Sequence, residues 1–556
     1  MDGLTLLLVA TAVFFIAYVT YGSWLAKQWG IDPKHTTPAV TKNDGIDYMP
    51  AKPAVLLGHH FSSIAGAGPI VGPITAAVFG WIPVVLWIVI GSIFFGGVHD
   101  YGSLVASIRH NGQSIGQIIN KNVGNRARLL FAVFAWVTLL VVIAAFANIV
   151  AVTFVANPSA GTTSLLFIVV AIAFGFGVYR TGLNLVVGSV LGLIAMGLCF
   201  YLGHIFPLAM SKQAWLLLLM AYIFVASIAP VWILLQPRDF LNSFLLYGMI
   251  IAAFVGICVY QPEMHLAGFA GFDLGGGNWL FPVLFITVAC GAISGFHSLV
   301  SSGTSSKQLD NEKNAKLIGY GSMLIEGLLA VIAVISVCYV AADKLPALLK
   351  AGGPVNAFSD GVATFMTALG FEHAFAKEFL ALTISAFALT TLDTATRLAR
   401  FILQETIAPN ASHIEATSAV YQTRKVLSNR YVATLITIAL AWILSTGSYL
   451  TIWPIFGTAN QLLAALALLA IAAWLKREGR NTLMVTIPMC FMFAVTLSSL
   501  VQLIYFNIGK NWTTVSLAVF LAALSVGLAA ETYRVFSRDK ALGNLQFSAQ
   551  QQQQQQ

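Results

Sequence analysis

The sequence contains little charge and few cysteines for a chain of 556 residues. Charged residues make up 9% of it, hydrophobic residues make up 58%, and the mean hydropathy is +0.83. No water-soluble fold can bury so much apolar surface, so the composition predicts an integral membrane protein in contact with the lipid bilayer. The five cysteines lie in apolar runs and form no Cys-x-x-Cys pair, which indicates packing roles rather than a disulfide or metal framework.

Motifs of catalysis and nucleotide binding are also absent from the sequence. The chain has no P-loop, which excludes a self-contained ATP-driven pump, and no HExxH motif that would support a zinc enzyme. The formal net charge of +8 would suit a nucleic-acid-binding protein, but most basic residues flank apolar runs, as they do in membrane proteins. We therefore expect no enzyme activity, no cofactor and no nucleic-acid partner.

Fifteen apolar runs are long enough to cross a membrane. They cover residues 4–26, 54–79, 81–108, 127–155, 162–179, 183–206, 214–235, 240–260, 279–302, 316–342, 375–403, 431–446, 449–474, 484–507 and 512–534. With the N-terminus outside, the only basic residues on the outer side are Lys212, Lys344, Lys350, Lys377 and Lys510. Because cytoplasmic loops are enriched in Lys and Arg, this asymmetry predicts an external N-terminus and a cytoplasmic C-terminus.

The second apolar run contains the stretch 58–73, GHHFSSIAGAGPIVGP, which makes a poor helix. Its glycines cost helix stability, its prolines lack amide donors, and its histidines and serines are polar at membrane depth. Unpaired backbone is tolerated in a membrane only where protein or a water-filled cavity satisfies it, so an interrupted helix predicts a solute site. The candidate substrate-binding residues in this stretch are His59, His60, Ser62, Ser63, Gly66 and Gly68.

A second interruption is predicted in the run 214–235, which contains Pro230 and follows five spans later. Five is odd, so the later run crosses the membrane in the opposite direction. Ser227, Ile228 and Ala229 before this proline resemble the triplet 63–65 before the first interruption. Paired interruptions predict an inverted repeat with a midplane site, to which Ser227 and Ala229 would contribute. The alternative is that both kinks serve helix packing alone.

Three serines in the run 279–302 could form a cation site. Ser298, Ser301 and Ser302 stand at i, i+3 and i+4, so a helix places their hydroxyls on one face. They could supply oxygen ligands to a small cation such as Na⁺, or bond back to the preceding helical turn. The sequence leaves both readings open.

Two carboxylates inside spans are candidates for proton coupling, because ionisable groups in a bilayer are expensive and need a reason. Glu326 lies ten residues after Lys316, about 15 Å along a helix and therefore close to mid-bilayer. Asp100 could pass a proton inward, and its structural alternative is a helix-end salt link with Arg109.

Two other charged groups are interpreted as structural. Asp393 and Arg397 are four residues apart on one predicted helix, so they could neutralise each other. Arg238 could hold a substrate carboxylate, but its place just beyond an apolar run favours a topology anchor.

Long motifs in the chain resemble the carbon starvation protein A (CstA) family. They are GHHFSSIAGAGPIVGP, WIPVVLWIVIGSIFFGGVHDYGSL with RHNGQSIGQII, PVWILLQPRDF, and GAISGFHSLVSSGTSSKQL, and the similarity runs through most of residues 45–530. The resemblance implies a bacterial inner-membrane carrier whose all-α fold has a five-plus-five inverted-repeat, LeuT-like core. It also implies short peptides or pyruvate as substrates, with proton-coupled uptake for the pyruvate carriers.

These observations predict the following division of the chain. An extra membrane helix (1–30) precedes a first five-helix repeat (54–206) and a second, inverted repeat (214–405), with further membrane helices at 431–534 and a disordered glutamine-rich tail at 541–556. The segment 354–369 mixes apolar and polar residues, which favours an external surface helix over a span.

The predicted function is a secondary active transporter that imports a small carboxylate-bearing nutrient, pyruvate or a short peptide, by alternating access. Protons are the expected coupling ion and Na⁺ is the alternative. A transporter-like sensor is a second reading. An intramembrane metalloenzyme using His59, His60, His99 and His297 is disfavoured, because adjacent residues point about 100° apart on a helix. The sequence does not indicate an oligomeric state.

Overall fold

The computed structural model describes residues 2–45, 48–230, 232–340, 344–350, 352–408, 418–446 and 449–554. Within these ranges the regular structure is helical, apart from three isolated β-bridges. The apolar runs form helices because a membrane offers the backbone no other hydrogen-bond partners. The prediction of an all-α membrane protein is confirmed.

The first half of the chain contains the elements up to α13. They are α1 (Gly3–Val19), α2 (Tyr21–Gln28), α3 (Pro38–Thr41), α4 (Pro53–Ile64), α5 (Gly68–Ala76), η1 (Ala77–Phe79), α6 (Trp81–Gly91), the π-helical η2 (Ser92–Gly96), α7 (Gly97–Arg109), α8 (Ile115–Asn122), α9 (Asn125–Ala156), α10 (Pro158–Tyr179), α11 (Leu185–Ile205), α12 (Lys212–Ile228) and α13 (Leu235–Tyr260).

The second half begins with shorter pieces and ends with long helices. They are η3 (Leu280–Leu284), α14 (Phe285–Thr287), α15 (Gly295–Gly303), η4 (Ser305–Lys307), η5 (Glu312–Asn314), η6 (Lys316–Gly321), α16 (Ser322–Cys338), α17 (Leu345–Lys350), α18 (Gly353–Thr367), α19 (His373–Ile407), α20 (Ala419–Leu427), α21 (Arg430–Ser445), α22 (Tyr449–Arg477), α23 (Leu483–Asn507) and α24 (Trp512–Gln554).

Among the described residues, eleven helices are long and apolar enough to cross a membrane, and up to 13 if each of two bent pairs counts as one span. One bent pair is α4 with α5–η1, at 43°, and the other is α20 with α21, at 68°. The two remaining predicted runs correspond to α12, which has 17 residues, and to the broken segment 280–303. The polytopic fold is therefore clear, while the count of fifteen spans stays a prediction.

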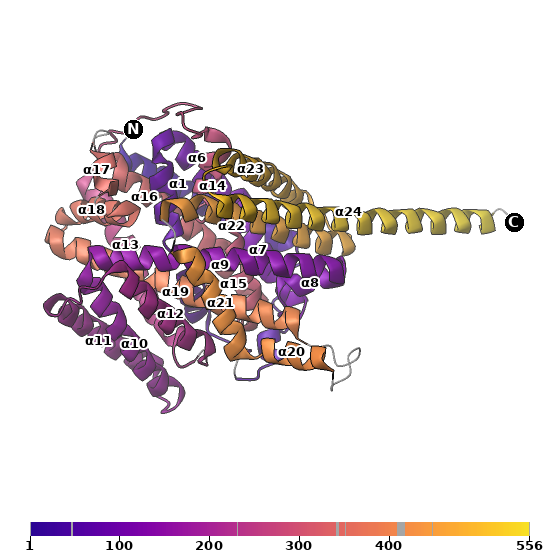
Figure 1. The fold of residues 1–556 in the computed structure, drawn as a ribbon, viewed down its shortest axis with the longest axis horizontal. Helices are drawn as coiled ribbons and strands as arrows, with labels where there is room; N and C mark the ends of the chain where they lie inside the picture. Colours follow the sequence, from indigo (N-terminus) through magenta and orange to yellow (C-terminus); the bar gives the residue numbers. More distant parts are fainter. Residues whose placement is uncertain are drawn as a thin grey trace.

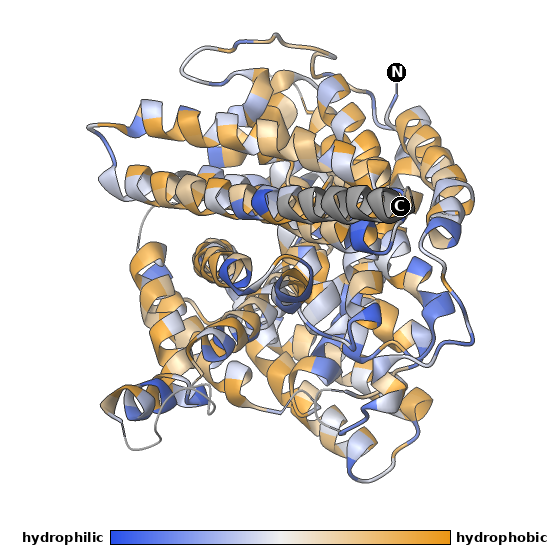
Figure 2. Ribbon diagram, turned by 90° about the vertical axis from the view of Figure 1, so that its right-hand side faces the viewer, coloured by the Kyte–Doolittle hydropathy of each residue, from blue (hydrophilic) through white to orange (hydrophobic). Residues whose placement is uncertain are grey.

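The outer helices present apolar side chains, as a lipid-facing surface requires. Figure 2 shows hydrophobic residues over most of the helices, and on the peripheral hairpin α10–α11 Val186 is 70% exposed and Ile194 is 65% exposed. Helices α17 and α18 lie at one end of the bundle, and α8 and α20 lie at the other (Figure 1). Functional groups are therefore to be sought inside the bundle and at its two ends.

Two peripheral predictions differ from the structure. Helix α18 has a largely buried face, including Phe358 and Phe365, and packs against α13, α16 and α19, so it is not a surface helix. Its apolar residues are spaced to bury one side against these neighbours. Helix α24 continues to Gln554 beyond the bundle (Figure 1), where the sequence predicted a disordered tail. Glutamine is a good helix former, so an existing helix can extend through it.

The first predicted interruption is present, but the second lies in a different helix. Helix α4 ends at Ile64 and α5 begins at Gly68. Helix α12 ends at Ile228, and α13 is a separate, continuous helix, so Pro230 lies in the connection between α12 and α13. The predicted interruption of the run 214–235 is therefore wrong.

The broken helix that meets the α4–α5 interruption is the segment 280–303. Its helical pieces α14 and α15 are separated by residues 288–294. A Cβ on Gly68 would lie 2.4 Å from the sulfur of Cys290, and one on Gly72 would lie 2.5 Å from the carbonyl oxygen of Thr287. Glycine at these positions lets the two interrupted backbones touch. The inverted repeat itself stays a prediction.

Candidate functional site

The polar residues of α4 are all buried and have partners on several other helices. His59, His60, Ser62 and Ser63 are each at most 1% exposed. The Nδ1 atom of His59 lies 3.1 Å from the carboxylate of Asp239 on α13. His60 Nδ1 lies 2.7 Å from the hydroxyl of Ser305 after α15. The stretch predicted to bind solute therefore connects the helices around it.

The interruption itself is held by α9 and α19. A Cβ on Gly66 would lie 2.6 Å from Phe146 on α9 and 2.6 Å from the hydroxyl of Thr391 on α19. That hydroxyl also donates to the carbonyl oxygen of Ser63, at 3.2 Å. A backbone carbonyl freed by the end of α4 thus finds a partner within the protein, as membrane depth requires.

A chain of four buried ionisable groups lies beside the two interruptions. His99 Nδ1 is 2.7 Å from Asp100 Oδ1, and His297 Nδ1 is 2.8 Å from Asp100 Oδ2. The other ring nitrogen of His297, Nε2, is 3.6 Å from the carboxylate of Glu326. All four side chains are completely buried. Asp100 and Glu326, predicted separately, are therefore linked through His297.

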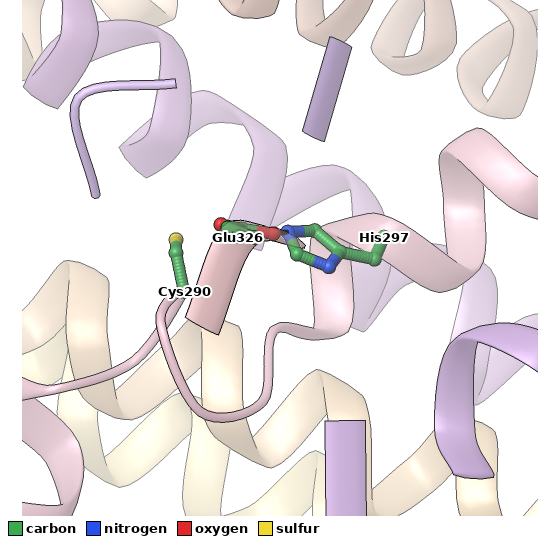
Figure 3. Close-up of side chains that lie close together, drawn as sticks. All are labelled: Cys290, His297 and Glu326. Carbon is green, nitrogen blue, oxygen red and sulfur yellow. Dashed lines mark ion pairs between the residues drawn. The ribbon is translucent and has the colours of Figure 1, made fainter. Parts of the chain in front are cut away.

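His297, Glu326 and Cys290 point toward one another in Figure 3. Among the described residues they form the one group of three or more His, Cys, Asp or Glu side chains whose ligand atoms lie within 4.8 Å of one another. Such donors could surround a cation, and sulfur, nitrogen and oxygen together suit Zn²⁺. The four histidines considered from the sequence do not form such a group, because His59 and His60 have the separate partners given above.

The alternative partner expected for Asp100 is wrong. Arg109 instead forms an ion pair with Glu312, at 3.1 Å, and donates to the carbonyl oxygen of Gly30. Arg109 lies at the end of α7, more than two helical turns beyond Asp100, so the two cannot meet within that helix.

A second buried network lies on the other side of α4. Arg238 is 3% exposed, forms an ion pair with Asp239 at 3.0 Å, and pairs with Asp393 on α19. Asp393 also accepts a hydrogen bond from Tyr222 at 2.7 Å. Arg238 is therefore a buried cation and not a topology anchor, because α13 begins at Leu235 and carries it into the bundle.

The carboxylate of Asp393 pairs with Arg238 and Tyr222, and its expected pair with Arg397 stays a prediction. Arg397 donates to the carbonyl oxygens of Ala226 and Ala229 at the end of α12. A helix end leaves carbonyl groups without intrahelical partners, and a guanidinium can satisfy them.

Among the remaining predicted site residues the four serines are buried and Ala229 is half-buried, but they do not meet at the interruptions. Ser298 donates to the carbonyl oxygen of Gly295, and Ser302 donates to that of Ser298, so both bond to their own helix. The hydroxyls of Ser301 and Ser227 are buried without a hydrogen-bond partner. Ser227 and Ala229 lie at the end of α12, where Arg397 binds.

Sequence reasoning overlooked several members of these networks. Asp239, next to Arg238, was not predicted as a site residue, because carboxylates are common at the edge of an apolar run. Cys290 was read as a packing residue, and His297 only as a metal ligand. The histidine inside the apolar motif GAISGFHSL was the available signal for His297.

Cavities open near both ends of the bundle. One, of about 740 Å³, lies at the α17–α18 end and is lined by Phe79, Trp453 and Phe506 among others. Another, of about 710 Å³, lies near α8 and is lined by Gln117 and Ser302 among others. The two ionisable networks are buried in the protein and line neither of these cavities. Such an arrangement defines a polytopic membrane transporter of the secondary carrier class.

Comparison with known proteins gives the family. The family model described as carbon starvation protein CstA matches residues 2–349 and 341–499, and the chain belongs to this family. The peptide transporter CstA of Campylobacter jejuni is 34% identical, over 90% of this chain and 80% of its own length. The pyruvate/proton symporter BtsT of Escherichia coli is 31% identical, over 87% of this chain and 79% of its own length.

A comparison with solved structures gives a weaker match. A manganese transporter from Eremococcus coleocola has a TM-score of 0.48 and 14% sequence identity, covering 87% of this chain and 94% of that one. The named relatives are transporters rather than enzymes. The chain is accordingly a multi-pass secondary transporter.

Proposed function

We propose that this chain imports a small carboxylate-bearing solute, pyruvate or a short peptide, together with protons. The observation that carries the proposal is the buried chain Asp100–His297–Glu326 beside two touching helix interruptions. The printed names of the relatives, peptide transporter and pyruvate/proton symporter, agree with such cargo and such coupling.

The contacts among Asp100, His297 and Glu326 support a proton held between His297 and Glu326. If His99 and His297 both donate Nδ1–H to Asp100, the Nε2 atom of neutral His297 is an acceptor facing the carboxylate of Glu326. Two acceptors 3.6 Å apart repel unless a proton is shared between them. Neither oxygen of Glu326 has another hydrogen-bond partner, and an unpaired buried carboxylate is costly.

We therefore assign proton carriage to Glu326, with His297 and Asp100 as its route. A proton that arrives on Glu326 neutralises its carboxylate beside His297. When the proton leaves, the carboxylate carries an uncompensated charge that favours a change of conformation. Protons are favoured over Na⁺, because the buried chain Asp100–His297–Glu326 consists of acid–base groups that can bind and release a proton. Ser301 remains the serine best placed to serve as a polar gate, since its hydroxyl has no partner.

For the substrate we retain the interruption of α4 and α5 as the binding region. His59, His60, Ser62, Ser63, Gly66 and Gly68 would line or shape it. Ser227 and Ala229 lie at the end of α12 and would act near the cytoplasmic entrance of this binding region. The orientation with the N-terminus outside and the C-terminus in the cytoplasm, in a bacterial inner membrane, belongs to the same proposal.

Uptake into proteoliposomes tests the proposal. Purified protein is supplied with labelled pyruvate, and in parallel with a labelled dipeptide, with or without an inward proton gradient or Na⁺. We expect accumulation of one of them that collapses when a protonophore is added. Uptake that follows Na⁺ and ignores the proton gradient would refute the coupling. Failure to take up either solute would refute the cargo.

A further inference from the structure

Cys290, His297 and Glu326 bring three kinds of ligand atom to one buried point. They come from three separate pieces of the fold, the connection 288–294, helix α15 and helix α16, and Figure 3 shows their side chains converging. Their sulfur, imidazole nitrogen and carboxylate oxygen atoms lie within 4.8 Å of one another. A proton shared between His297 and Glu326 involves only two of these groups, so the proposed function leaves the sulfur of Cys290 without a role.

The nitrogen and oxygen atoms that meet at this point are acceptors. Nε2 of His297 and both carboxylate oxygens of Glu326 are buried and have no hydrogen-bond partner. Because His297 gives its Nδ1–H to Asp100, its Nε2 carries a lone pair when the ring is neutral. Within the described part of the chain, the ion-pair partners of Asp100 and Glu326 are histidines and include neither Lys nor Arg. Such a buried set of lone pairs is satisfied by a bound cation.

The spacing of the ligand atoms fits a transition-metal ion. Zn²⁺ binds sulfur at about 2.3 Å and nitrogen or oxygen at about 2.0 Å, so its tetrahedral ligands lie about 3.3 to 3.6 Å apart. Nε2 of His297 and Oε2 of Glu326 are 3.6 Å apart. The sulfur of Cys290 lies within 4.8 Å of the other two ligand atoms, so it reaches the required separation by moving at most about 1.2 Å. Mg²⁺ and Ca²⁺ prefer oxygen ligands alone and do not suit this set.

The residues around the three ligands hold them as the surroundings of a metal site do. A histidine that binds a metal usually donates its other ring N–H to a carboxylate, and His297 does so to Asp100 at 2.8 Å. Asp100 is fixed in turn by His99, at 2.7 Å. The side-chain amide of Asn460 on α22 donates to the sulfur of Cys290, at 3.9 Å. These contacts orient the nitrogen and sulfur ligands toward the point that they share with Glu326.

We propose that Cys290, His297 and Glu326 form a binding site for one transition-metal ion of the Zn²⁺ type, and that the bound ion stops transport. Binding releases the thiol proton of Cys290 to solvent, because the thiolate is the ligand. The ion takes the lone pairs of His297 and Glu326 that the transported proton needs, and it ties the connection 288–294 to α15 and α16. The block of transport rests on the proposed function, while the binding itself does not.

Equilibrium dialysis of the full chain in detergent measures the binding, with Co²⁺ as the probe. Co²⁺ accepts the same nitrogen, oxygen and sulfur ligands as Zn²⁺, and a bound thiolate gives it a charge-transfer absorption band in the near ultraviolet. We expect one Co²⁺ per chain, this band, and displacement of Co²⁺ by Zn²⁺ but not by Mg²⁺. Cys290→Ser should abolish the band. His297→Gln and Glu326→Gln should each weaken binding at least tenfold, because each removes a ligand.

Matched variants keep this measurement specific. Cys338→Ser removes a buried cysteine of α16 that lies outside the group, and Glu478→Gln changes the charge of a half-exposed residue. Both should bind Co²⁺ as the unmodified chain does. Asp100→Asn keeps all three ligands and should weaken binding about tenfold, because Asp100 only orients His297. Melting temperatures show which variants remain folded, and the nearly isosteric Cys290→Ser tests the site by itself.

Uptake into proteoliposomes measures the block of transport. Zn²⁺ should inhibit proton-driven uptake by the unmodified chain and by Cys338→Ser, and a chelator should restore it. At least tenfold more Zn²⁺ should be needed for the same inhibition in Cys290→Ser, because one of three ligands is lost. The inhibition of each variant is expressed as a fraction of its own uptake without metal.

The outcomes separate this inference from the proposed function. A chain that transports its solute but binds no Co²⁺, or that keeps the charge-transfer band in Cys290→Ser, overturns the metal site and leaves the proposed function intact. Equal inhibition by Zn²⁺ in Cys290→Ser and in the unmodified chain overturns the block of transport at this site. A chain that binds Co²⁺ through Cys290 but takes up neither pyruvate nor a dipeptide overturns the proposed function, while the metal site stands.

Discussion

Replacing Glu326 by Gln is the sharpest test of proton coupling. The substitution keeps the shape of the side chain and removes its ability to release a proton. The new amide can donate to Nε2 of His297, which lies 3.6 Å from the present carboxylate, so the buried pair stays satisfied. We therefore expect a folded protein that still binds and exchanges substrate but cannot use a proton gradient.

The size of the effect follows from the coupling. If one proton moves with one monocarboxylate, the cycle carries no net charge and is driven by the pH difference alone. Each pH unit is worth about 1.4 kcal/mol, so it supports about tenfold accumulation. In Glu326→Gln the ratio of internal to external substrate should fall from about ten to about one.

Proteoliposomes at internal pH 7.5 and external pH 6.5 provide the assay. Net accumulation and exchange against preloaded substrate are measured on the same preparation. Glu478→Gln serves as the control, since Glu478 is half exposed at the end of α22 and the charge change is identical. Tenfold accumulation in Glu326→Gln would refute the role of Glu326. Loss of exchange as well as accumulation would indicate a structural role instead.

Three further predictions concern packing, charge and pH. Gly68→Ala places a Cβ 2.4 Å from the sulfur of Cys290, and such overpacking should cost about 1 to 3 kcal/mol and lower the melting temperature. Arg238→Gln leaves buried carboxylates unpaired and should cost about 3 to 5 kcal/mol, part of which returns when Asp393→Asn is added. Burial lowers the pKa of His110, beyond the end of α7, so stability should fall as pH drops below about 6.5, and less so in His110→Gln.

Thermal unfolding of the purified protein measures all three. The packing control is Gly197→Ala on α11, where an added Cβ meets nothing within 4 Å and should do no harm. An Arg238→Gln protein as stable as the unmodified chain would contradict the buried network. For His110 the direction of the effect is fixed. Because its pKa is lower in the folded state than in the unfolded state, the stability is intact above about pH 6.5 and falls on acidification. A flat profile between pH 7.5 and 5.5 would contradict the burial argument.

The α4–α5 interruption was predictable because its cause is local. Gly66, Gly68 and Pro69 oppose a helix wherever they occur, and the histidines nearby are unusual at membrane depth. Pro230 gave the same kind of indication and misled. A proline also suits the connection between two separate spans, and the sequence does not distinguish that role from a break within one.

The sequence by itself determined the class of protein, the positions of its apolar helices and the presence of costly buried charges, since composition and hydropathy are properties of the chain read in order. Only the tertiary structure decided which charges meet. Asp100 pairs with His297 rather than Arg109, and Arg238 with Asp393 rather than with lipid headgroups. The physical reason is that these partners lie on different helices, and the packing of helices against one another is set by shape and polar contacts across the bundle, which linear spacing does not record.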